Sequence, residues 1–504
     1  MLTRRDWLAA SASSLSPLTG TQKQTPRRRA KQPNFLFLIA DDHAAYVMGA
    51  DGDRQAVTPH LDQLAAQGAR FAAHYCNSPV CTPSRQSFFT GQMPSTVGVT
   101  RLPTPLNPDK PTLAKQFKQA GYRTAVIGKM HFNRRASPGL HGFDYLITER
   151  ELAADWNKNV RPRPIPQEIR TKPAWRPFRD PARIWLNADK LPYPRYEQDM
   201  KAAYQVRLAE QFLEENRQTP FALWVSFHEP HSPFDFPVEL RSKFDPKTFH
   251  PPRVGPEDGW QIPKIFRDLT EEDKQGILAA YYTSVFYLDQ NLGRLLEKLR
   301  RLNLEENTLV VYTADHGYDL GHHGRFEKHC GWDPALRVPV IWRYPGKIRP
   351  GVIHDLTEHL DLAPTVVDLL DLEPLPIQHG RSLRPYFENR KIQPRPYIFS
   401  QYLENEEAYV RTHRWKLIYG SGKRARGDGY ETDHPTPGRY VRLYDLQADP
   451  DEFTNVAERF PGLVAELEQI LLDRFRSTHP EADQEPPNSD REAILDWYLR
   501  PRDV

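Results

Sequence analysis

The chain has 504 residues, of which 39% are hydrophobic and 26% charged, so it is long enough for one large domain or two ordinary ones with a substantial core. Lys and Arg number 68 and Asp and Glu 65, and this near balance argues against a nucleic-acid-binding protein, which usually shows a clear basic excess. An aromatic content of 11% argues against global disorder, and no apolar run reaches the length of a membrane-spanning helix.

The N-terminal segment predicts export. A twin arginine, Arg4-Arg5, precedes a short and weakly apolar stretch that ends near Leu18, as in twin-arginine export signals. A chance pair in an arginine-rich chain is the alternative. We therefore expect residues 1–32 to be an export signal and linker, and the protein to be periplasmic or secreted.

Strands and helices alternate through the next part of the chain. Continuous apolar runs are typical of strands buried on both faces, and they lie at residues 35–40, 124–128, 221–227, 308–313 and 338–342. Helical patterns are found at residues 58–68, 111–119, 270–302 and 362–370. The alternation predicts an α/β fold in which helices sandwich a large mixed, mostly parallel sheet. The Pro-, Arg- and Trp-rich segments 150–200 and 230–268 are expected to be long loops.

The pattern changes after residue 393. Strands are expected at residues 397–402, 409–419 and 440–446, around a Gly- and Arg-rich loop, and a helix at residues 462–475. The chain is therefore predicted to contain a large α/β domain at 33–393 and a smaller C-terminal α+β subdomain at 394–504, with a small antiparallel sheet.

Polar side chains follow four of the predicted strands. They are Asp41-Asp42, Lys129 with His131, His228 with His231, and Asp315-His316. Ligands bind beyond the carboxyl ends of the strands in parallel sheets, so we expect these residues at one site. Three carboxylates would repel one another there unless a cation lay between them, and oxygen ligands favour Ca²⁺ or Mg²⁺. Because His316 is a softer ligand, the identity of the metal stays open.

The string Cys81-Thr82-Pro83-Ser84-Arg85 predicts an anion site. It indicates a helix that begins just after Cys81, whose free N–H groups and positive dipole end would face that residue. Arg85 would lie on the same helix face as Cys81, and the two together suit attack on a tetrahedral oxyanion. Three cysteines cannot make a disulfide framework, and the other two, Cys76 and Cys330, are expected to be small buried side chains.

Several motifs together resemble a known family. The string from Cys81 to Arg85 resembles the signature Cys-x-Pro-Ser-Arg of sulfatases of the alkaline phosphatase superfamily, in which the cysteine is oxidised to formylglycine. Further motifs occur in the family's order: Gly128-Lys129-Met130-His131, His228-Glu229-Pro230-His231, Asp315-His316-Gly317 and the segment 321–328. The resemblance covers nearly the whole chain. It implies a sulfuric ester hydrolase with an alkaline phosphatase-like fold.

The resemblance also implies a role for each site residue. The metal, Ca²⁺ or else Mg²⁺, would be bound by Asp41, Asp42, Asp315, His316 and the modified Cys81. The charge on the sulfate oxygens would be offset by Arg85, Lys129 and Lys328.

Catalysis would then begin with attack of the aldehyde hydrate of Cys81 on sulfur. His231 would protonate the departing alcohol with help from Lys328, and His131 would take a proton from the remaining hydroxyl to expel sulfate. A formylglycine-generating enzyme would be the maturation partner. His228 would be either structural or in contact with substrate.

The substrate stays open at this stage. Alternatives to a glycan sulfatase are a phosphonate monoester or phosphodiester hydrolase, a choline-sulfatase-like enzyme for a small molecule, and an inactive glycan-binding protein. We favour a sulfated glycan because an exported enzyme would meet sulfated polysaccharide. The loop histidines His322, His323 and His329 are expected to be packing residues. The arginines between Arg161 and Arg183 would be a solvated loop or would bind a polyanionic glycan.

Overall fold

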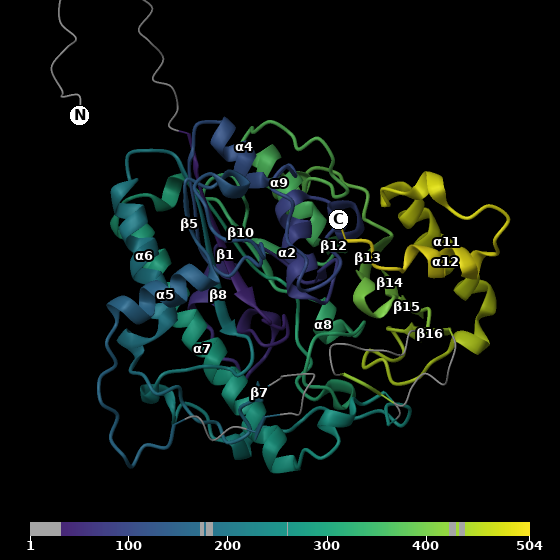
Figure 1. Ribbon diagram of the computed structural model, residues 1–504, viewed down its shortest axis with the longest axis horizontal. Coiled ribbons are helices and arrows are strands. Elements are labelled where there is room, and N and C mark those ends of the chain that lie inside the picture. The colour runs from purple at the N-terminus through teal and green to yellow at the C-terminus, as the bar shows by residue number, and fades with distance from the viewer. Residues whose placement is uncertain are drawn as a thin grey trace, which may run out of the picture. The chain divides into compact units, whose positions relative to one another are not determined.

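A computed structural model describes residues 32–171, 176–177, 185–259, 261–422, 430–432 and 439–503 (Figure 1). The predicted export signal lies outside these residues except for Gln32, as do Arg179, Arg183 and most of the Gly- and Arg-rich loop. Within the described part of the chain, every helix is too short or too polar to cross a membrane.

A mixed sheet of eight strands forms the centre of residues 33–504. The strands, in order across the sheet, are β11 (Gly351–Ile353), β2 (Ala69–Phe71), β10 (Val340–Arg343), β9 (Thr308–Ala314), β1 (Asn34–Asp41), β8 (Phe221–Pro230), β4 (Arg123–Gly128) and β5 (Tyr145–Ile147). The strands from β9 to β5 in this order are parallel neighbours, whereas β10 is antiparallel to both β9 and β2. This arrangement confirms the predicted fold class.

Both faces of the sheet are covered by helices because successive side chains of the central strands point to opposite sides. Leu36 and Leu38 of β1 belong to one hydrophobic cluster, whereas Phe35 and Phe37 belong to the other. Figure 1 shows α5, α6 and α7 on one side of the sheet and α4 and α9 on the other. The first cluster includes residues of α1 (Pro59–Ala66), α5 (Glu149–Asn159), α6 (Lys201–Glu215) and α7 (Glu271–Arg301). The second includes residues of α2 (Cys81–Thr90), α4 (Leu113–Gln119) and α9 (Leu362–Leu369).

The C-terminal part forms a separate antiparallel sheet against which α11 packs. The prediction of one strand at 409–419 was wrong, because the segment folds into two strands. Thr412 turns the chain: its hydroxyl oxygen accepts the backbone N–H of Trp415 at 2.8 Å. The elements are β13 (Tyr397–Tyr402), β14 (Glu407–Thr412), β15 (Trp415–Gly420), β16 (Tyr440–Asp445), α11 (Pro461–Thr478) and α12 (Arg491–Tyr498).

An ion pair joins this sheet to a helix of the α/β part. The Lys416 ammonium of β15, which is fully buried, lies 2.7 Å from a carboxylate oxygen of Asp333 at the start of α8 (Asp333–Leu336), and 2.5 Å from one of Glu452 within the C-terminal part. The division at residues 393 and 394 stays a prediction.

The segment 150–200 was wrongly predicted to be loop throughout, because α5 begins at Glu149 and reaches Asn159. Only Leu152 and Trp156 of this helix are buried, which leaves too few apolar residues for a visible helical period. The remaining elements are the helices α3 (Pro94–Val97), α8 (Asp333–Leu336) and α10 (Arg384–Phe387), the strand pair β3 (His74–Tyr75) with β12 (Thr357–Glu358), and the strand pair β6 (Arg176–Pro177) with β7 (Trp185–Leu186).

Candidate active site

The carboxyl ends of β1, β4, β8 and β9 bring the predicted residues together. Asp41 is the last residue of β1, Lys129 follows β4, and Asp315 follows β9. Since these strands are parallel neighbours, residues more than 270 positions apart in the chain meet: the Asp42 N–H donates to Asp315 Oδ1 at 3.2 Å.

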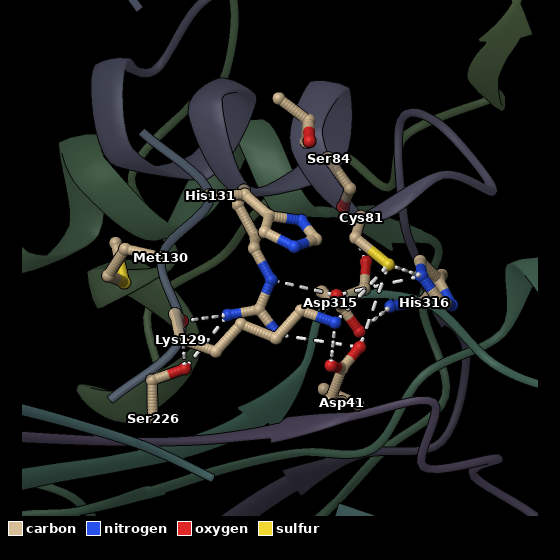
Figure 2. Close-up of polar contacts among 12 residues, drawn as sticks. Asp41, Cys81, Ser84, Lys129, Met130, His131, Ser226, Asp315 and His316 are labelled. Carbon is tan, nitrogen blue, oxygen red and sulfur yellow. Dashed lines mark hydrogen bonds and ion pairs between the residues drawn. The ribbon is translucent and has the colours of Figure 1, made fainter. Parts of the chain in front are cut away.

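Cys81 lies at the centre of this cluster. Its sulfur is 3.1 Å from His316 Nε2, 3.6 Å from Asp41 Oδ1 and 3.9 Å from Lys129 Nζ. Figure 2 shows these side chains gathered around the thiol. Helix α2 begins at Cys81 itself, and all ten of its residues are buried. The thiol is therefore held at the N-terminal end of a helix inside the protein, among charged groups.

The three carboxylates belong to two overlapping groups of side chains that could hold a cation. Asp41, Asp42 and Asp315 are all fully buried, and Asp42 has a left-handed backbone with φ of 66°. Burial, partly offset by Lys328 and reinforced by Asp41, raises the pKa of Asp42 to about 7. Asp42 thus carries a desolvation and repulsion cost that a bound cation would relieve, whereas Lys129 and other nearby cations hold the pKa of Asp41 well below its usual value despite its burial.

His316 is prepared to act as a ligand. Its Nδ1 lies 3.0 Å from the carbonyl oxygen of Gly317, so Nδ1 carries the proton and Nε2 faces Cys81 with a lone pair. Burial and the nearby Lys328 lower the pKa of His316 well below its usual value, which keeps the ring neutral. Ligand atoms of Asp41, Cys81, Asp315 and His316 all lie within 4.8 Å of one another, and so do those of Asp41, Asp42, Cys81 and His231.

Arg85 offers a donor to an anion. Its Nε donates to Asp315 Oδ2 at 2.8 Å, and its Nη1 donates to the Lys129 carbonyl at 2.5 Å and to Ser226 Oγ at 2.8 Å. The remaining nitrogen, Nη2, is buried, has no hydrogen-bond acceptor and lies 3.6 Å from Asp41 Oδ1. A buried guanidinium nitrogen without an acceptor is costly, and a sulfate oxygen would satisfy it.

Two lysines complete the positive charge. Lys129 is ion-paired with Asp41, and the Lys328 ammonium lies 2.8 Å from Asp42 Oδ1. Burial opposes the charge on Lys328, but Asp42, Cys81, Asp41 and Asp315 together more than compensate and raise the pKa of that ammonium well above its usual value. Both lysines are therefore protonated near neutral pH.

The histidines flank this charged centre. The His231 Nδ1 lies 2.6 Å from the Ser232 carbonyl and its Nε2 lies 3.9 Å from Asp42 Oδ2. The His131 Nε2 lies 3.7 Å from Glu149 Oε1, which also accepts the backbone N–H of His131 at 2.9 Å. Burial, and then the nearby lysines, lower the pKa of both rings well below the usual value.

A cavity of about 520 Å³ opens onto these groups. Sequence reasoning did not single out Glu149, Lys201 or Tyr430, and no motif marks them. It placed His329 in loop packing, whereas the structure places this ring on the cavity wall, 4.7 Å from the Tyr430 ring. The lining residues are Asp42, Cys81, Leu102, Lys129, His131, Glu149, Lys201, His228, His231, Ser232, Tyr318, Glu327, Lys328, His329 and Tyr430.

The other residues expected to be packing lie away from the cavity lining. Cys76 and Cys330 are buried free thiols. His322 packs edge-on against Tyr46, and His323 stacks on Trp332 with its Nδ1 3.0 Å from Asp258.

Comparisons with known protein families give consistent matches. The model of the family described as Sulfatase matches residues 33–372, and that described as N-sulphoglucosamine sulphohydrolase, C-terminal, matches residues 321–477. A choline-sulfatase of Rhizobium meliloti is 30% identical over 481 residues, which cover 88% of this chain and 86% of the relative. An N-acetylglucosamine-6-O-sulfatase of Bacteroides thetaiotaomicron is 26% identical over 554 residues, which cover 97% of this chain and 92% of the relative.

Solved structures share the fold. A phosphonate monoester hydrolase of Agrobacterium radiobacter aligns with a TM-score of 0.73 and 23% identity, covering 89% of this chain and 96% of that one. A protein solved in complex with its substrate D-glucosamine-2-N,6-O-disulfate aligns with a TM-score of 0.70 and 22% identity, covering 91% of this chain and all of the other.

Proposed function

The chain belongs to the sulfatase family and is a sulfuric ester hydrolase, and from this premise we propose that it removes sulfate from a sulfated glycan with a formylglycine made from Cys81. The observation that carries the proposal is the surroundings of the Cys81 sulfur. It lies within 4 Å of Asp41, His316 and Lys129, at the N-terminal end of a buried helix. Such surroundings suit an oxygen nucleophile and a bound sulfate far better than a packing thiol.

A divalent cation is part of the proposal. Asp41, Asp42, Asp315, His316 and the oxidised Cys81 would hold Ca²⁺, or alternatively Mg²⁺, because four of these five ligands offer hard oxygen atoms once Cys81 is a hydrate. When bound, the ion supplies positive charge that stabilises the ionised nucleophile and the sulfate oxygens.

The chain's own residues would then carry the reaction. An oxygen of the Cys81 aldehyde hydrate attacks sulfur, and the bond between sulfur and the ester oxygen breaks. His231 passes a proton from Nε2 to the departing alcohol. Because its Nδ1 already donates to the Ser232 carbonyl, the ring must first take up a proton on Nε2, which the negative charge of the bound substrate would favour. Arg85 Nη2 and the two lysines offset the negative charge that builds on the sulfate oxygens.

The second half of the cycle restores the aldehyde. His131 takes the proton of the remaining hydroxyl on Cys81, the carbon–oxygen bond to sulfate breaks, and sulfate leaves. Water then adds to the aldehyde to regenerate the hydrate. A formylglycine-generating enzyme is the partner that the modification requires, and export of the chain through its N-terminal segment is part of the same proposal.

Mass spectrometry of the peptide around residue 81 tests the nucleophile. Coexpression with a formylglycine-generating enzyme should convert –CH₂SH to –CHO, with the corresponding loss of mass. The Cys81→Ala variant should fold and lose turnover by at least about a thousandfold. An unmodified thiol in an active preparation, or an active Cys81→Ala variant, would overturn the proposal.

Two alternative activities can be distinguished from glycan sulfatase activity by the substrate that the enzyme prefers. The choline-sulfatase relative favours a small-molecule ester, and the phosphonate monoester hydrolase fold favours a phosphonate. Rates on sulfated N-acetylglucosamine, on choline sulfate, and on a matched sulfate and phosphonate ester of one alcohol decide between them. We expect the highest kcat/KM on the sulfated saccharide; a clear preference for choline sulfate or the phosphonate would replace the glycan assignment.

A further inference from the structure

One lysine of the cavity has no part in the proposed sulfate chemistry. Lys201 is half-buried and lines the same cavity as Lys129 and Lys328. Those two ammonium groups are ion-paired with Asp41 and Asp42. Among the described residues, the Lys201 ammonium forms neither an ion pair nor a hydrogen bond, so its charge is available to a ligand.

The carboxylates on the cavity wall are engaged elsewhere. Glu149 accepts the backbone N–H of His131 at 2.9 Å. Glu327 is fully buried, and its carboxylate is ion-paired with Arg325 and lies 3.1 Å from His329 Nδ1. Neither of these acids is ion-paired with Lys201. The buried Glu229 interacts with Lys201 electrostatically, but among the described residues the two form no ion pair, and burial raises the pKa of Glu229 to about 7.

The helix that carries Lys201 gives no reason for its charge. Lys201 is the first residue of α6, and the first turn of that helix contains no acidic residue. The N-terminal end of a helix carries a partial positive charge, where a lysine is electrostatically unfavourable. The helix would be as stable, or more so, with a neutral residue at this position.

The location of Lys201 relates it to the departing alcohol. The His231 ring lies 3.9 Å from Asp42 and its centroid is 4.7 Å from that of His228. Lys201 lines the same cavity as these two rings, and its ammonium adds to the effect of burial in lowering the pKa of His228. An alcohol that takes its proton from His231 would leave into the cavity that His228 and Lys201 line.

These observations deepen the proposed function and rest on it. We propose that Lys201 binds a second anionic group of the substrate, a carboxylate or another sulfate carried by the departing alcohol. A cavity of about 520 Å³ is within the usual range for small-molecule sites, so one sugar residue with both groups would fit. A quaternary ammonium group in the same place would be repelled.

The test compares Lys201→Gln with the unmutated enzyme, both carrying formylglycine at residue 81. The substrates are N-acetylglucosamine with one sulfate, glucosamine with two sulfates, and a sulfated disaccharide with a uronate carboxylate. We expect the variant to raise KM about tenfold for one of the two doubly charged substrates and less than about twofold for the singly charged one. The substrate that responds identifies the second group as sulfate or carboxylate, and Lys201→Arg should restore most of the affinity.

The controls separate this proposal from the one on which it depends. Lys347→Gln removes an exposed lysine remote from the cavity lining and should change no KM. If Lys201→Gln changes KM equally for singly and doubly charged substrates, or changes it for neither, the proposed Lys201 subsite is wrong. Turnover of a sulfated saccharide in the same assays would still support the proposed hydrolase. Failure of the modified enzyme to act on any sulfated saccharide overturns the proposed function instead.

Discussion

The Arg85 guanidinium and the Asp315 carboxylate form a fully buried ion pair, with Nε 2.8 Å from Oδ2. The same guanidinium holds the end of β4 through the Lys129 carbonyl, and it holds β8 through Ser226 within that strand. It therefore ties β9, β4 and β8 together beside Cys81, and it retains one donor without an acceptor.

Replacing Arg85 should reduce activity more than stability when the charge is kept. Arg85→Lys preserves a partner for Asp315, but one ammonium cannot reach all the acceptors of a guanidinium and also hold a sulfate oxygen. We expect kcat to fall by about a hundredfold or more, with a modest fall in Tm. Arg85→Ala leaves a buried carboxylate without its partner and should cost about 3–5 kcal/mol of unfolding free energy.

Arg343→Lys is the matched control for this variant. Arg343 is also largely buried and ion-paired, with Nη2 2.6 Å from Glu305, but its side-chain hydrogen bonds are to Glu305 and Gln67 rather than to the residues around Cys81. The control should retain full kcat. Equal kcat losses in the two variants, measured alongside Tm, would mean that Arg85 acts only through packing.

Removal of the proposed divalent ion should lower both stability and activity. Without it, the buried carboxylates of Asp42 and Asp315 each lie within 4.8 Å of the Asp41 carboxylate, and burial with the Asp41 charge raises the pKa of Asp42 to about 7. An ion present at a hundred times its dissociation constant stabilises the fold by about 2.7 kcal/mol, so chelation should lower Tm by several degrees.

Thermal unfolding with a chelator, followed by addition of Ca²⁺ or Mg²⁺, measures this effect. The Asp315→Asn variant should bind the ion more weakly and gain less stability from it. A Tm and a kcat that are both indifferent to chelation would contradict the assignment of a metal site to this cluster.

The fall in kcat caused by replacing His231 should depend on the leaving group of the substrate. If His231 Nε2 protonates the departing oxygen, His231→Gln should lose about a hundred- to ten-thousandfold in kcat on an alkyl or sugar sulfate. An aryl sulfate whose phenol is acidic needs little protonation, so the loss there should be much smaller. Steady-state rates on both esters check the prediction; equal losses on the two would assign His231 a role in binding rather than proton transfer.

Much of this site could be read from the sequence because its residues follow strands of a parallel sheet. Apolar runs located β1, β4, β8 and β9, and the topology then required Asp41 and Asp315 to meet. The family resemblance supplied Cys81, Arg85 and Lys328 as members of the same cluster.

The residues that sequence reasoning missed depend on contacts with no local pattern. Ser226 meets Arg85 across 141 positions, and Glu149 reaches the His131 backbone from the start of a helix that was predicted to be a loop. Lys201 looks like any surface lysine until α6 is packed against β8. Such contacts follow from tertiary packing, which the hydrophobic periodicity and the motif spacing of a sequence do not reveal.

A buried carboxylate far from the cavity should make stability depend on pH. Asp289 of α7 accepts the backbone N–H groups of His60 and Leu61, at 3.1 and 2.8 Å, where α1 begins. Burial, only partly offset by these N–H groups, raises the pKa of Asp289 to about 7. The folded state therefore holds the proton more tightly than the unfolded chain does. The resulting stabilisation is complete below the unfolded pKa of about 4 and is lost as pH rises through about 7.

Asp289→Asn should remove this dependence, because the amide oxygen can still accept both N–H groups and carries no charge. Relative to the unmutated protein, the variant should gain unfolding free energy as pH rises from 5 to 8, by at most about 1.4 kcal/mol for each pH unit below the folded pKa. Urea unfolding at several pH values measures the difference, with Asp473→Asn, an exposed acid on α11, as the control that should follow the unmutated protein. Parallel pH curves for Asp289→Asn and the unmutated protein would mean that Asp289 stays ionised in the fold, held by the N-terminal end of α1.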